Sequence, residues 1–176
     1  FFNADTADLV VNASEIGGIA FRSNNLRTYI DLGERVGLFY SNGADSYVDL
    51  PENEYICYID KLRWDMKLDQ LKLGENKDNS SGTRFISTNP LQDSISFLAK
   101  TASYNLNDYV INASGVDSIL VADAIIYPDS GKLVVEKSAI IQTLDNATVI
   151  ANNLTQYHTF KKSSINIKGR FNYTGK

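Results

Sequence analysis

Cysteine and histidine are almost absent from this sequence, which holds one residue of each, Cys57 and His158, in 176. A single cysteine excludes a disulfide within the chain, although it does not exclude export, since many bacterial envelope proteins lack disulfides. A single histidine leaves no histidine-rich metal site and makes a catalytic triad hard to build. The sequence therefore predicts no metal and no cofactor.

Long apolar runs are absent as well. The longest span only four or five residues, as in residues 119–122, so no segment is predicted to cross a bilayer as a helix. The net charge is −4, and Lys161-Lys162 is a basic cluster too small for a nucleic-acid footprint. Phe1-Phe2 is not a natural start, and we expect the chain to be a piece of a longer protein.

Alternation of apolar and polar residues with period two is the main signal that is present. It is clearest in residues 62–69 and 165–173, and residues 69–73 break it in a way that suggests a bulge. Further strand-like runs recur about every ten residues, at 8–12, 19–22, 26–30, 36–40, 47–50, 55–60, 94–99, 109–113, 118–121, 124–127, 132–136, 147–151 and 156–160. We expect an all-β fold of many short strands, in an elongated β-sandwich, a jelly roll or a solenoid-like architecture.

The polar stretch 74–82 has no apolar residue and is predicted to be an exposed loop. We expect one β-rich module over residues 1–176, and two strand sets divided near 74–82 remain an alternative. Residues 8–14 and 108–114 echo each other without a gap, 100 residues apart. Such an echo is either a structural repeat or chance in a chain rich in Asn, Ser and Ala.

A recognisable pattern of strand-like runs and turns occurs in residues 97–104, 109–116 and 121–133, which include Ala122-Asp123-Ala124 and Tyr127-Pro128-Asp129-Ser130-Gly131. It resembles segments of large β-rich cell-envelope proteins of the Bacteroidota, and more distantly the β repeats of periplasmic lipopolysaccharide-transport proteins. The first resemblance implies an exported protein of the periplasm, outer membrane or cell surface. Its partners would be other segments of the parent protein or envelope proteins. The second implies a β groove for lipid or glycolipid.

Three Asp-Ser/Thr triplets, each followed by a small or branched apolar residue, bear on the same resemblance. Exported proteins of the Bacteroidota carry O-linked glycans at such triplets, which makes Thr6, Ser94 and Ser118 candidate O-glycosylation sites. The alternative is an ordinary Asp-Ser/Thr pair at a turn or strand edge that carries no glycan.

The remaining candidates for chemistry have simpler structural explanations. Cys57 is expected to be a buried, inert thiol, and His158 a structural or surface residue. Asp65 and Asp69 share one face of the predicted strand with basic neighbours, which is typical of a solvated face and not of a catalytic carboxylate pair. We therefore expect a protein that is not an enzyme.

Aromatic residues are the last signal, with ten Tyr, eight Phe and one Trp. Trp64 alternates with Met66 and Leu68 and is expected to point into the core, whereas exposed Tyr side chains could stack on sugars or on a partner protein. We expect a structural or interaction module of an exported envelope protein. A lipid or glycolipid groove and a carbohydrate-binding domain are the alternatives, and no nucleic-acid partner is expected.

Overall fold

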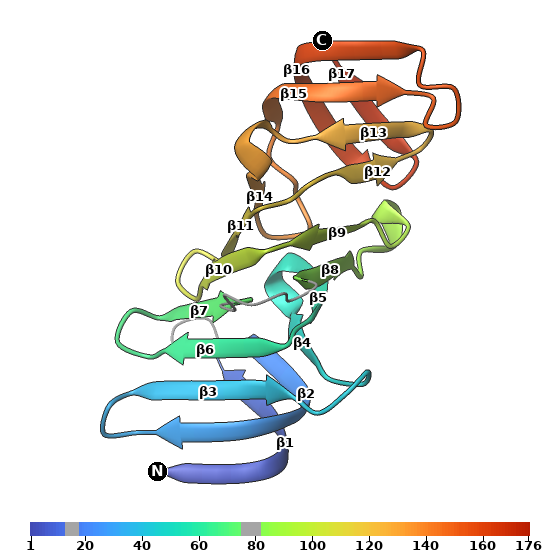
Figure 1. Ribbon diagram of the computed structural model, residues 1–176. Coiled ribbons are helices and arrows are strands. Elements are labelled where there is room, and N and C mark those ends of the chain that lie inside the picture. The colour runs from blue at the N-terminus through green and yellow to red at the C-terminus, as the bar shows by residue number, and fades with distance from the viewer. Residues whose placement is uncertain (13–17, 75–81) are drawn as a thin grey trace.

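The computed structural model describes residues 1–12, 18–74 and 82–176, and its regular structure is almost entirely strand. Strands account for 62% of the chain and helix for 5%, which confirms the all-β prediction. The molecule is elongated, with its strands lying across the long axis and its two termini at opposite ends (Figure 1). Within the described ranges, no helix is long and apolar enough to cross a membrane.

The larger sheet has twelve antiparallel strands and begins with the long pair β1 (Phe2–Asn12) and β2 (Ile19–Asp31). One branch leads away from β2 through β3 (Val36–Ser41), β6 (Lys61–Asp65), β7 (Gln70–Leu73), β10 (Thr101–Asn105), β11 (Val110–Ser114) and β14 (Leu133–Val135). The other branch leads through β4 (Tyr47–Leu50), β5 (Tyr55–Tyr58), β8 (Thr83–Ser87) and β9 (Ser96–Ala99).

The two branches form two layers because β2 bends. Residues 26–31 of β2 pair with β3, residues 22–24 pair with β4, and Asn25 between them has a left-handed φ of 52°. The inner faces of both branches share one hydrophobic core, in which Phe39 and Leu62 of the first branch join Phe85 of the second, all fully buried. Alternation in the sequence thus places one face of each branch in this core.

A second, five-stranded sheet completes the far end of the molecule. Its order is β12 (Ile119–Val121), β13 (Ala124–Tyr127), β15 (Leu144–Ala151), β16 (His158–Gly169) and β17 (Asn172–Gly175). β15 and β16 form a long antiparallel pair with register shifts, and both Asn146 and Lys162 have a left-handed φ. The bend in this pair parallels the bend in β1 and β2 at the opposite end (Figure 1).

Successive hairpins alternate between the two sides of the molecule. β2–β3, β6–β7 and β10–β11 extend the first branch, while β4–β5 and β8–β9 extend the second and β12–β13 begins the second sheet. Within the larger sheet, β3 pairs with β6, β7 with β10 and β5 with β8, so these hairpins lie beside hairpins two positions away in the sequence. This pairing gives the solenoid-like member of the predicted architectures, with two hairpins per structural repeat.

The first-branch hairpins share one turn chemistry. The side-chain oxygen of the last strand residue accepts hydrogen bonds from the backbone N–H groups of the turn that follows, and the residue four positions later has a left-handed φ. The accepting residues are Asp31, Asp65 and Asn105, with Asn152 in the same role between β15 and β16, and the left-handed residues are Arg35, Asp69, Tyr109 and Gln156.

These turns also stack on one another along one side of the molecule. The N–H of Met66 donates to the carbonyl of Arg35 at 3.0 Å, and the N–H of Leu106 donates to the carbonyl of Asp69 at 2.8 Å. Each bond joins consecutive hairpins of the first branch outside the strand ladder. Met66 and Leu106 also pack partly buried against the core, so the stacked turns extend the contact between repeats.

Three short 3₁₀ helices make the other connections: η1 (Pro51–Asn53), η2 (Pro90–Gln92) and η3 (Asp129–Gly131). Asn53 of η1 is fully buried, and its amide donates to the carbonyls of Tyr109 at 2.7 Å and Val135 at 3.3 Å. Gln92 of η2 donates to the carbonyl of Ala139 at 2.6 Å. These amides tie the second branch to the first branch and to the connection after β14.

Several sequence predictions need correction at the level of single elements. The alternation over residues 62–69 does not form one strand, because β6 ends at Asp65 and residues 66–69 turn into β7. Leu68 lies in that turn and is 62% exposed, so it does not point into the core with Trp64. The predicted bulge over residues 69–73 is this turn and strand β7.

The polar stretch 74–82 lies largely outside the described residues, but its flanking strands are in one sheet. β7 before it pairs with β10, and β5 before it pairs with β8, so the strand sets do not divide there. The echoing segments also differ in place, since residues 8–12 belong to edge strand β1 and residues 110–114 form β11, an inner strand. Residues 13 and 14 of that echo lie outside the described residues.

Candidate functional site

The first candidate site is the outer edge of β1 at the N-terminal end of the stack. β1 pairs with β2 along its whole length, and no other strand of the described ranges pairs with it. Its backbone N–H and C=O groups on the far edge are therefore open, over an element of eleven residues. An open edge of this length is a template for adding a further strand.

The second candidate site is the opposite end, formed by β16 and β17. β17 covers only residues 165–169 of β16, whereas residues 158–160 of β16 pair on their other side with β15. The outer edge of the first half of β16 carries no partner strand in the part of the chain that the structure describes. Phe160 lies on this half of the strand and is 55% exposed.

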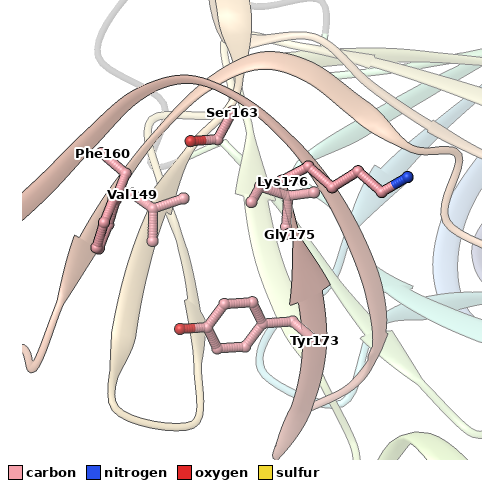
Figure 2. A pocket seen from close by; sticks show the side chains of 7 residues that line it. Val149, Phe160, Ser163, Tyr173, Gly175 and Lys176 are labelled. Carbon is pink, nitrogen blue, oxygen red and sulfur yellow. The ribbon is translucent and has the colours of Figure 1, made fainter.

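An apolar cavity of about 290 Å³ lies beside that open edge, between β15, β16 and β17. Val149, Phe160, Ile165 and Tyr173 supply most of its lining. Figure 2 shows the ring of Tyr173 across the opening from Val149 and Phe160, with the amine of Lys176 directed outward. The end of the stack thus presents an apolar hollow, an open strand edge and a cationic rim together.

The outermost strands of the two ends carry charges of opposite sign. No aspartate or glutamate follows Asp145, and the exposed basic residues at this end are Lys161, Lys162, Lys168, Arg170 and Lys176. At the other end, β1 holds exposed Asp5 and Asp8 and no basic residue. The Asp8 carboxylate accepts from the N–H of Asn25 at 2.8 Å, while no ion pair in the described ranges involves any of these residues.

The candidate O-glycosylation residues lie apart from one another. Thr6 is exposed on β1, where its hydroxyl accepts a 3.4 Å hydrogen bond from the amide of Asn42. Ser94 is exposed in the turn after η2, and Ser118 is half-buried just before β12. Thr6 and Ser94 are open to solvent, and glycosylation at all three positions stays a prediction.

Cys57 and His158 occupy the positions that the sequence suggested. Cys57 is fully buried in β5, and burial raises the pKa of its thiol well above the ordinary value, with the negative charge of Asp49 acting in the same direction. His158 is exposed at the start of β16. The two residues lie in different sheets, so the structure does not bring them together.

The carboxylates of residues 65 and 69 serve the turn between β6 and β7. Asp65 accepts from the N–H groups of Lys67 at 3.1 Å and Leu68 at 3.3 Å, and Asp69 is the exposed left-handed residue of that turn. Among the residues that the structure describes, no three acidic, cysteine or histidine side chains are placed to hold a metal.

Trp64 packs against the core, as predicted. Its ring meets that of Phe21 edge to face, with 5.4 Å between the ring centroids. The exposed aromatics lie elsewhere: Tyr157 precedes β16, Phe160 lies in its first half, and Phe171 lies in the turn between β16 and β17. Sequence reasoning missed this end of the molecule, although the run of basic residues without any acid after Asp145 was a readable signal.

Comparisons with known proteins found nothing similar to this chain: no protein-family model, no curated protein and no solved structure matches it.

Proposed function

We propose that this chain is a non-enzymatic structural and interaction module of an exported bacterial envelope protein, and that it binds its neighbours through the two ends of its stack. The observation that carries the proposal is the open strand edge at each end. The unpaired backbone groups of β1 and of the first half of β16 are in the geometry that strand addition requires.

The composition of the ends supports the same reading. A stable interface needs an apolar centre with a polar rim, and the cavity that Phe160 lines, with Lys176 at its rim, has that composition. The partners are other segments of the parent protein or other envelope proteins. Export to the periplasm, outer membrane or cell surface is part of the proposal and is supported by the resemblance to Bacteroidota envelope proteins.

Site-specific photo-crosslinking in the native bacterial host tests the proposal. A crosslinking phenylalanine analogue is placed at Phe2, at Phe160 or, as a control on an inner strand, at Tyr58 of β5; these side chains are 50%, 55% and 40% exposed. We expect crosslinks to envelope proteins or to other parts of the same protein from the two end positions. Equal yields at Tyr58, or crosslinks confined to cytoplasmic proteins, would contradict the proposal.

A lipid or glycolipid ligand is the second candidate function, and the apolar cavity favours it. Val149, Ile165 and Tyr173 offer a surface for an acyl chain, and Lys176 lies at the rim for an anionic head group. Native mass spectrometry of the protein purified from envelope membranes is the test. A spectrum without co-purified lipid counts against this candidate. A carbohydrate-binding role has less support, because Trp64 packs against the core and is not free to stack on a sugar.

A further inference from the structure

We infer that copies of this chain associate head to tail, with the acidic strand β1 of one copy docking on the basic strands β16 and β17 of the next. The inference rests on the proposed function and names the partner of its two end sites. Its occupant is a second copy of the chain. Three independent observations support this occupant: strand length, surface chemistry and charge.

The free edges at the two ends are similar in length and curvature. β1 offers an edge of eleven residues, and the opposite end offers the first half of β16 followed by the four residues of β17, which covers the second half. Both β1 and β16 belong to long antiparallel pairs whose register shifts bend them around the end of the stack. Antiparallel pairing of stacked hairpins is also the contact that already joins successive repeats within the chain. Docking of a second copy continues that contact between molecules.

The exposed apolar side chains of the two ends complement the strand edges. Phe2 and Val10 are exposed on β1, and the opposite end offers the cavity lined by Phe160 and Tyr173. In a single copy of the chain, these large apolar side chains are exposed to water. Bringing the ends together buries them in the centre of an interface, with the charged residues at its rim.

Charge fixes the direction of the association. Two copies of β1 repel each other through their aspartates, and two copies of β16 repel each other through their lysines. Asp5 of one copy instead attracts Lys161 and Lys162 of the next. An isologous dimer is therefore disfavoured. A head-to-tail contact is heterologous and leaves one free end on each side, so it produces open chains of growing length and not a closed pair.

Sedimentation velocity of the 176-residue chain over a wide range of concentrations tests the inference. We expect oligomers that grow with protein concentration and that dissociate as salt is raised, because exposed charges are screened. A chain that stays monomeric throughout overturns the inference, and so does association that salt leaves unchanged. If the two ends bind lipid or another protein and not a second copy, the purified chain sediments as a monomer.

Charge reversal supplies the decisive variants. Asp5→Lys and Lys161→Glu each place like charges at the contact, and each is expected to weaken association by about fivefold. Neither side chain makes a hydrogen bond or ion pair in the described structure. The combined variant D5K/K161E restores opposite charges and is expected to recover association, as is an equimolar mixture of the two single variants.

Matched controls are Asp117→Lys and Lys132→Glu, which make the same charge changes at exposed positions away from both ends. They are expected to associate like the unmodified chain, and circular dichroism checks that every variant is folded. Equal weakening by the controls, or no recovery in the combined variant, overturns head-to-tail association. Monomeric behaviour overturns this inference alone, whereas the crosslinking experiment still decides the proposed function.

Discussion

Replacing Asn53 with alanine tests how the two layers of the stack are held together. Asn53 lies in η1 on the second branch, is fully buried, and donates from its amide to the carbonyls of Tyr109 and Val135, at 2.7 and 3.3 Å. Those two carbonyls belong to the first branch. The variant Asn53→Ala therefore removes a cross-layer link without touching the strand ladders.

The expected cost follows from hydrogen bonding. Each bond contributes about 1 kcal/mol net, and each buried carbonyl that loses its donor adds a desolvation penalty of similar size. Because the 3.3 Å bond is long, we expect a total loss of about 2–3 kcal/mol in the free energy of unfolding. For a chain of this length, that corresponds to a fall in Tm of about 5–10 °C.

Urea unfolding followed by circular dichroism measures this cost. Asn112→Ala is the control, since Asn112 is exposed on β11 and its side chain makes no hydrogen bond in the described structure; it should change stability by less than about 0.5 kcal/mol. In the variant Asn53→Asp, a carboxylate faces two carbonyl oxygens, and this raises the pKa of that carboxyl in the folded state. The variant should therefore lose stability as the pH rises above about 4. A cost below about 0.5 kcal/mol for Asn53→Ala would refute the cross-layer role.

The remaining predictions concern a thiol, a turn and a glycine. Burial raises the pKa of Cys57, so a thiol reagent should label it only after unfolding, and rapid labelling of the folded chain would contradict its placement in the core. Asp65→Ala removes two turn hydrogen bonds and should cost about 1 kcal/mol in urea unfolding; an unchanged midpoint would show that the turn does not need them. Gly74 has a φ of 76°, and a Cβ there would lie 2.5 Å from the carbonyl oxygen of Lys100, so Gly74→Ala should cost more than about 1 kcal/mol; the control Gly33→Ala, where φ is not left-handed, should cost clearly less.

The sequence was sufficient for the fold class because alternation is a local signal. In β11, for example, Ile111 and Ala113 are buried and Asn112 between them is exposed, as period two requires. Burial of Cys57 and the core position of Trp64 follow from the same rule. Each of these predictions needs only the residue and its nearest neighbours along the strand.

The pairing order could not be derived in this way. Alternation says which face of a strand is buried but not which strand lies beside it, and here hairpins pair with others two hairpins away. β2 was expected as two separate runs because the bend at Asn25 interrupts its alternation, yet that bend creates the two layers. The resulting position of the open edges depends on this non-local order.

One repeat signal was present and was missed. Asp31-Leu32, Asp65-Met66 and Asn105-Leu106 each begin a first-branch turn, with spacings of 34 and 40 residues. An acidic or amide side chain followed by a large apolar residue is a short pattern that occurs by chance in many chains. Its meaning becomes clear only when the stacked turns and their left-handed residues are seen together.

Residue-resolved amide hydrogen exchange at low protein concentration tests the central claim, that each end of the stack presents an open strand edge. In β6, which lies between β3 and β7, all amides of the strand should be protected. In β1, and in residues 158–163 of β16, only the amides that face the neighbouring strand should be protected, and the outward ones should exchange close to the unprotected rate. Uniform protection along β1 and the first half of β16 in the monomer would show that the edges are covered and would contradict the account.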